Sequence, residues 1–132
     1  MLTLDLALRL QAAGVAWTPA PGDRFVVPDR DMDDEVFVVS DMTVQVHDFP
    51  TGSVIGFNGT TEWALDSLAQ GEVVWIPRED QLRELVGAEF DRLESVPGGF
   101  AVVTADEDGE RRHVDLDAER AYARAVLAAR EL

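Results

Sequence analysis

Short apolar segments separated by turn-forming residues constrain the fold of this chain more than any other feature of its sequence. Proline and glycine interrupt these segments at Pro50-Thr51-Gly52 and Pro97-Gly98-Gly99, and an acidic run ending in glycine does so at 106–109. We expect strands over residues 24–27, 36–40, 43–48, 53–57, 73–76, 92–95, 100–104 and 111–114. Runs of strands with such short connections predict antiparallel meanders and not repeated βαβ units.

Helical signals precede, interrupt and follow these strands. Thr3 is a suitable N-cap and Gly14 a suitable stop, which predicts a helix over 3–13. Leucines at every second position from 2 to 10 also fit a strand, but the absence of β-branched residues favours the helix. A short helix is expected over 62–70, where several N-cap residues come first.

The two later helices carry clearer signals. Pro77 suits the first helical position, and Gly87 ends the apolar stripe that follows it. In the last segment Asp117 can cap a long helix with many alanines, and Leu116 can staple it. The sequence therefore predicts a single α+β domain over residues 1–132, with an antiparallel meander sheet and about four helices, including a long C-terminal helix.

The charge of the chain excludes several function classes. Its 26 acidic residues outnumber 11 basic ones, all arginine, and the net charge is −15. Direct binding to nucleic acid or to an anionic membrane is disfavoured, because both need clustered positive charge. The chain has no cysteine, no long apolar run and no features of a secretory signal, so a cytoplasmic protein is expected. Residues 31–77 contain nine acids and no arginine, which places the anionic field in the middle of the chain.

The segment PDRDMDDEVF, residues 28–37, is the densest acidic stretch. Its D-x-D-x-D start resembles a calcium loop, but the sixth position has Asp34 where glycine is needed, and the twelfth has Ser40 where a glutamate is needed. Three interpretations stay open: a solvated turn, a calcium or magnesium site of another kind, and a partner-binding surface. The cation site would use Asp29, Asp31, Asp33 and Asp48, and the partner surface would use Asp29, Asp31, Asp33, Asp34 and Glu35.

Other polar and aromatic residues give weaker signals. His47 and Asp48 are neighbours in an expected strand, so they point to opposite faces and do not form a catalytic dyad. His47 and Trp63 are candidate flanks of the acidic surface, whereas Trp75 is expected in the core and Trp17 at a core edge. The chain contains no nucleophile motif and no phosphate-binding loop, so no catalytic residue is assigned.

Four blocks of the sequence together resemble a known family. They are PDRDMDDEVF, DMTVQVHDFP, GFNGTTEWALDS and WIPREDQLRELVG, and the similarity runs over about residues 2–90 and includes a similar alanine-rich terminal helix. The family consists of small actinobacterial proteins of unassigned role, some of which carry an automatic label of pilus assembly protein. Proteins that properly bear that label resemble P-loop ATPases, and this chain has no such loop. The resemblance therefore implies an actinobacterial origin and no activity.

These observations favour a non-enzymatic binding or adaptor module that uses an acidic surface. Its expected partner is another protein, with a basic one favoured by charge. One alternative is a divalent-cation or small-molecule binding protein, including a minimal enzyme, for which calcium or magnesium would be the cofactor. The other alternative is a purely structural homodimer, in which exposed edge strands pair and the acidic face maintains solubility.

Overall fold

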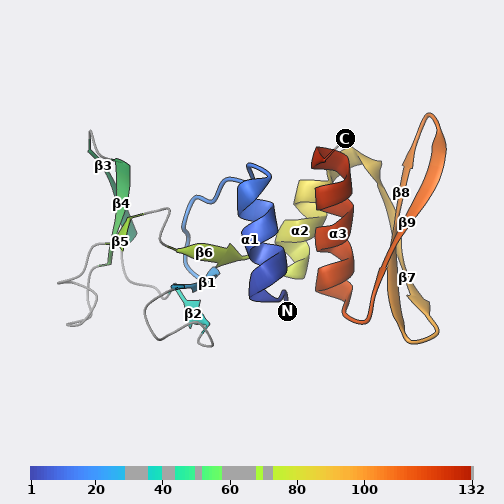
Figure 1. The fold of residues 1–132 in the computed structure, drawn as a ribbon, viewed down its shortest axis with the longest axis horizontal. Helices are drawn as coiled ribbons and strands as arrows, with labels where there is room; N and C mark the ends of the chain where they lie inside the picture. Colours follow the sequence, from blue (N-terminus) through green and yellow to red (C-terminus); the bar gives the residue numbers. More distant parts are fainter. Residues whose placement is uncertain (29–35, 40–43, 50–51, 58–67, 70–72, 132) are drawn as a thin grey trace. The chain divides into compact units, whose positions relative to one another are not determined.

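The computed structural model describes residues 1–28, 36–39, 44–49, 52–57, 68–69 and 73–131 (Figure 1). The chain forms two compact units. The terminal unit combines Met1–Val15 with Pro77–Leu132, and the central unit is Ala16–Ile76.

A three-stranded antiparallel sheet is the base of the terminal unit. It contains β7 (Phe90–Val96), β8 (Gly99–Asp106) and β9 (Gly109–Asp115), with β8 between the other two. Each strand is longer than predicted, and the two turns lie at the predicted positions. Gly99 is needed at the start of β8, because a Cβ atom there would collide with the backbone of Asp115 on the neighbouring strand.

Three α-helices complete the described part of the terminal unit. They are α1 (Leu4–Ala12), α2 (Glu79–Val86) and α3 (Ala118–Arg130), and a 3₁₀ turn, η2 (Gly87–Glu89), joins α2 to β7. Helix α3 contacts β8 and β9, and both α1 and α2 contact α3. In Figure 1, α3 accordingly lies between α1 and the sheet.

Small side chains on α3 form its buried face. The buried residues of this helix are Ala121, Tyr122, Ala123, Ala125, Val126 and Leu127. On the opposing strand β8, Val102 shares the helix-facing side of the sheet with Leu93 and has no exposed surface. The alanine-rich face of α3 therefore packs against the sheet.

Most helix ends are set by capping side chains or by glycine. The Thr3 hydroxyl accepts a hydrogen bond from the amide of Leu6, at 3.2 Å, and the Asp117 carboxylate accepts one from the amide of Arg120, at 3.0 Å. Gly87 ends α2 with a φ of 75°, a conformation that glycine adopts without a steric cost.

Two predicted end signals are wrong. Pro77 is not the first residue of α2, because the Gln81 side chain accepts a hydrogen bond from the Arg78 amide at 2.9 Å and the helix begins at Glu79. Leu116 does not staple α3 through a buried contact, since it is 72% exposed.

The central unit contains two further antiparallel sheets. In the first, β1 (Arg24–Val26) lies between β2 (Phe37–Val38) and β6 (Val74–Ile76). The second has the order β3 (Val44–Phe49), β4 (Gly52–Phe57) and β5 (Leu68–Ala69). The predicted hairpin across residues 50–52 is confirmed by the pairing of β3 with β4.

An aromatic cluster is the core of the first of these sheets. Trp17 and Trp75 stack with ring centroids 6.4 Å apart, and Phe25 lies 5.9 Å from Trp17. The indole N–H of Trp17 donates to the buried carboxylate of Asp23 at 2.9 Å, and the amide of Ala20 donates to the same oxygen at 3.0 Å. Trp75 packs against the cluster, as predicted, but is only partly buried, whereas Trp17 is fully buried.

The α+β class, the antiparallel sheets and the long C-terminal helix are confirmed, with three corrections. The described residues contain three α-helices and not four. Of the helix predicted over 62–70, residues 62–67 and 70 lie outside the described part of the chain, and Leu68–Ala69 form a strand paired with β4. The strands predicted over 36–40 and 43–48 belong to different sheets and do not continue one meander. The single domain expected from chain length stays a prediction.

Truncation of Leu82 tests the packing of α2. This side chain is completely buried, so Leu82→Ala should lower the free energy of unfolding by about 2–5 kcal/mol. Leu116→Ala is the matched control, and it should change stability by no more than about 0.5 kcal/mol because Leu116 is exposed. Urea unfolding followed by circular dichroism measures both. Equal losses in the two variants would contradict this packing.

Candidate functional site

A groove lies beside strand β7 in the terminal unit. Its volume is about 1010 Å³, and its walls come from α2, η2, β7 and one residue of α3. The residues that line it are Glu79, Asp80, Arg83, Glu84, Gly87, Ala88, Phe90, Asp91, Arg92, Leu93 and Tyr122. Because β8 and β9 contribute nothing to it, the groove lies at the β7 edge of the sheet.

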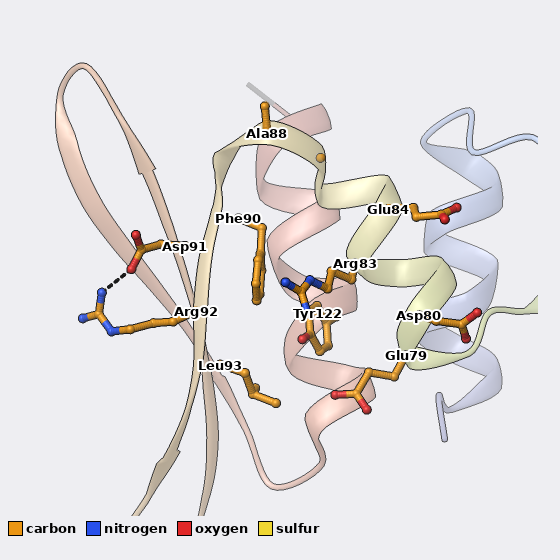
Figure 2. A pocket seen from close by; sticks show the side chains of 11 residues that line it. Glu79, Asp80, Arg83, Glu84, Ala88, Phe90, Asp91, Arg92, Leu93 and Tyr122 are labelled. Atoms are coloured by element: carbon orange, nitrogen blue, oxygen red, sulfur yellow. Dashed lines mark hydrogen bonds and ion pairs between the residues drawn. The ribbon is translucent and has the colours of Figure 1, made fainter.

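Aromatic rings form the floor of this groove. The rings of Phe90 and Tyr122 stack at 5.7 Å with an angle of 22° between their planes, and the guanidinium carbon of Arg83 lies 4.4 Å above the centre of the Phe90 ring. Figure 2 shows these three side chains and Leu93 in the space between the helices and β7. A cation over an aromatic face is favourable, so Arg83 is held in place by Phe90.

Acidic residues dominate the charged part of the lining. Four carboxylates and two arginines line the groove. In Figure 2 the Glu79 carboxylate lies on the same side of α2 as Tyr122 and Leu93, whereas Asp80 and Glu84 extend from the other side of the helix. Burial raises the pKa of the Tyr122 hydroxyl, and the negative charge of Glu79 adds to this effect. Tyr122 therefore stays neutral at physiological pH, where it can donate a hydrogen bond.

An ion-pair ladder crosses the other face of the same sheet. On β7, Arg92 pairs with Glu94 at 2.6 Å and with Glu110 of β9 at 3.1 Å, and it also pairs with Asp91. Glu94 in turn pairs with Arg112 of β9. Hydrogen bonds from Arg92 and Arg112 hold the pKa of the Glu94 carboxyl below its usual value.

This ladder explains the burial of residues that no helix covers. Ala101 and Val103 of β8 are paired with Glu94 and Arg92, respectively, so they share the face of the ladder. Both have no exposed surface. The long charged side chains reach from β7 to β9 across β8, and their aliphatic parts cover these two apolar residues.

A carboxylate at the end of β9 connects the sheet to α3. The Asp115 side chain, 8% exposed, receives Arg124 at 2.8 Å and Arg120 at 3.1 Å, and the amide of Asp117 donates to it at 3.2 Å. Burial raises the pKa of this carboxyl, but the two arginines and the hydrogen bonds outweigh burial and lower it. Asp115 is therefore ionised in the folded protein and fixes the start of α3.

His113 is the histidine whose environment the structure defines. Its Nε2 atom lies 3.2 Å from the Thr104 hydroxyl of the neighbouring strand. Burial lowers the pKa of the imidazole, and the nearby charge of Arg111 lowers it further. The folded protein therefore favours the neutral ring.

The residues predicted to bind a partner lie mostly outside the described part of the chain. Asp29, Asp31, Asp33, Asp34, Glu35 and Trp63 lie outside the described residues. His47 and Asp48 lie on β3, where they pair with Val54 and Ser53 of β4.

Neither a cluster of metal-binding side chains nor a membrane-spanning helix is found among the described residues. No group of three or more His, Asp or Glu side chains in this part of the chain is arranged to hold a metal ion. None of the helices described is both long enough and apolar enough to span a bilayer. The weak cation alternative, with Asp29, Asp31, Asp33 and Asp48, is not tested by the first finding, because three of these residues lie outside the region searched.

Sequence reasoning did not identify the groove. Tyr122 lies within the alanine-rich helix predicted for the last segment, and Phe90 lies outside every predicted element. The one signal available was an aromatic residue directly before a charged strand, and that signal is common in sheets. No family model, no curated protein and no solved structure matches the chain.

Replacement of Asp115 tests the connection between β9 and α3. Asp115→Asn removes the charge that holds Arg120 and Arg124, and it should lower the free energy of unfolding by about 1–3 kcal/mol. Asp108→Asn, at the exposed β8–β9 turn, is the matched control and should have an effect of no more than about 0.5 kcal/mol. Chemical unfolding compares the two, and an Asp115 variant as stable as its control would refute the role assigned to this carboxylate.

The pH dependence of stability tests the environment of His113. A histidine whose pKa is lower in the folded state binds fewer protons there, so its contribution is complete above the usual pKa of 6.5 and is lost as the pH falls through the folded value. Urea unfolding between pH 8 and about pH 5 should show falling stability in the wild type and a smaller fall in His113→Gln.

His47→Gln is the control for this measurement, because His47 and His113 are the two histidines of the chain. The comparison is made between about pH 8 and pH 5, a range that lies above the pH at which most carboxylates titrate. An NMR titration that placed the pKa of His113 at or above 6.5 would contradict the assigned environment.

Proposed function

We propose that this chain is a non-enzymatic, cytoplasmic binding or adaptor module that holds a basic protein partner against the acidic surface of its central unit. The surface is formed by Asp29, Asp31, Asp33, Asp34 and Glu35, with His47 and Trp63 at its flanks. The observation that carries the proposal is the division of charge between the two units.

The central unit has an excess of negative charge that its own residues do not balance. It contains eleven acidic residues and two arginines, a formal charge of −9. Like charges at this density repel one another, and a positively charged ligand relieves the repulsion. A basic protein surface supplies that charge over a wide area, whereas a single small cation would need a compact set of ligands.

The terminal unit has a smaller excess of negative charge. It contains fifteen acidic residues and nine arginines, a formal charge of −6. Six of these arginines, namely Arg9, Arg78, Arg92, Arg112, Arg120 and Arg124, form ion pairs with carboxylates of the same unit. The larger formal charge of the central unit, −9 against −6 in the terminal unit, supports a contact role for the central unit.

Charge reversal in a pull-down experiment tests the proposal. The immobilised wild-type chain should retain a basic protein at about 50 mM salt and release it at about 500 mM, where screening shortens the range of the interaction. The triple variant Asp31→Lys, Asp33→Lys and Asp34→Lys should retain at least about fivefold less, since it removes the field that attracts the partner.

A matched variant separates position from net charge. Asp106→Lys, Glu107→Lys and Asp108→Lys change the charge equally, but they lie in the β8–β9 turn of the terminal unit. Retention by this control should fall less than about twofold. The proposal fails if nothing is retained at low salt or if both triple variants lose retention equally.

Thermal melting separates this proposal from the alternatives. A rise in midpoint with millimolar calcium, magnesium or manganese would favour the cation-binding protein, because a ligand that binds only the folded state stabilises it. A dimeric mass in light scattering, without retention of any partner, would favour the structural homodimer.

A further inference from the structure

The outer edge of β7 is an unpaired strand edge beside the groove. In the sheet order β7-β8-β9, β7 pairs with β8 on one side, and no described strand pairs with the other side. The backbone amide and carbonyl groups along such an edge are a template for an additional strand. Regular pairing with β8 runs from Arg92 to Val96, which gives five residues of regular edge.

The side chains that usually protect a strand edge are directed inward here. Charged residues on edge strands commonly discourage the addition of another strand. Arg92 and Glu94 are such residues, but their ion pairs with Glu110 and Arg112 extend them across β8 to β9. The ladder therefore covers the middle of the sheet and draws these side chains away from the outer edge of β7.

A bulge in β7 brings two apolar side chains to the groove side of this edge. Phe90 and Leu93 are three positions apart, so in a regular strand they would point to opposite faces. The pairing register shifts between Phe90 and Arg92. As a result Phe90 and Leu93 both lie on the helix side in Figure 2, whereas Asp91 and Arg92 lie on the other side. Bulges beside functional sites often redirect side chains in this way.

From these features we propose that the outer edge of β7 binds an extended, basic peptide segment of a partner protein as a fourth strand. Its main chain would pair with residues 92–96, and its alternate apolar side chains would enter the groove over Phe90 and Leu93. Basic side chains suit the site because the Glu79 carboxylate lies on the groove side of α2 and the terminal unit has a formal charge of −6. The inference shares with the proposed function only the basic character of the partner.

A pair of defined peptides tests strand addition directly. A fluorescein-labelled peptide of sequence KVKVKVK alternates basic and apolar residues, whereas KPKVKPK has the same charge but lacks two of the backbone N–H donors that strand pairing uses, and its prolines disfavour addition to a sheet. Fluorescence anisotropy at about 150 mM salt should show at least about tenfold tighter binding of the first peptide. Equal affinities would mean that the peptides are held by charge alone, and that result would overturn the proposal.

Hydrogen exchange then locates the bound peptide. The first peptide should slow amide exchange in residues 90–96 and leave β9, the other edge of the same sheet, unchanged. Protection of β9, or of neither strand, would contradict the assignment. A dimeric chain with β7 already protected in the absence of peptide would show that a second copy occupies this edge, which would also overturn it.

Variants distinguish this site from the acidic central unit. Glu79→Gln removes a carboxylate at the groove and should weaken binding of KVKVKVK about twofold to fivefold, whereas Glu107→Gln at the β8–β9 turn should leave it unchanged. The triple variant at residues 31, 33 and 34 should keep the preference for KVKVKVK over KPKVKPK. Loss of that preference in the triple variant, or equal effects of the two glutamine variants, would count against the β7 edge.

Discussion

The packing of α3 against β8 is the interaction on which the terminal unit depends. Helix α3 contacts α1, α2, β8 and β9, so the other elements are connected through it. Ala121 and Ala125 lie one turn apart on its buried face, and their small side chains let the helix approach the sheet closely. Buried alanines lose little side-chain entropy on folding, so the contact is made at a low entropic cost.

Charged side chains add further contacts to the packing of α3 against the sheet. Asp115 connects the end of β9 to the start of α3 through two arginines, and the ladder around Arg92 covers the sheet face that no helix reaches. Most of these pairs are at least partly exposed, so they contribute little to stability individually. Their main effect is on geometry: they set where long side chains lie, and they leave the β7 edge and the groove beside it accessible to an extended peptide.

Local signals in the sequence predicted the elements whose ends depend on near neighbours. Thr3 and Asp117 cap their helices because each needs only an amide three residues further along the chain. The hairpin turns at 50–52 and 97–99 follow from proline and glycine in the same way. Pro77 does not begin α2, because the Gln81 side chain accepts a hydrogen bond from the Arg78 amide and the helix starts at Glu79.

The pairing of strands that lie far apart in the sequence could not be predicted from these local signals. Phe25 of β1 pairs with Phe37 and with Trp75, which is 50 positions away, and no turn signal in the chain specifies this second partner. The residues predicted as helix at 68–69 pair with β4, because an available strand edge can override a weak local helical preference. The groove depends on the bulge in β7, which arises from pairing with β8.

The sequence by itself determined the class of the fold, the sign and division of the charge, and the ends of most helices, because composition and contacts within a few residues decide these properties. Only the tertiary structure decided which strands share a sheet, where the ladder around Arg92 lies, and that Phe90 and Tyr122 meet beneath Arg83. Those features include contacts between distant residues, such as Arg92 with Glu110, 18 positions apart, and Phe90 with Tyr122, 32 positions apart, and their geometry is set by the packing of whole elements.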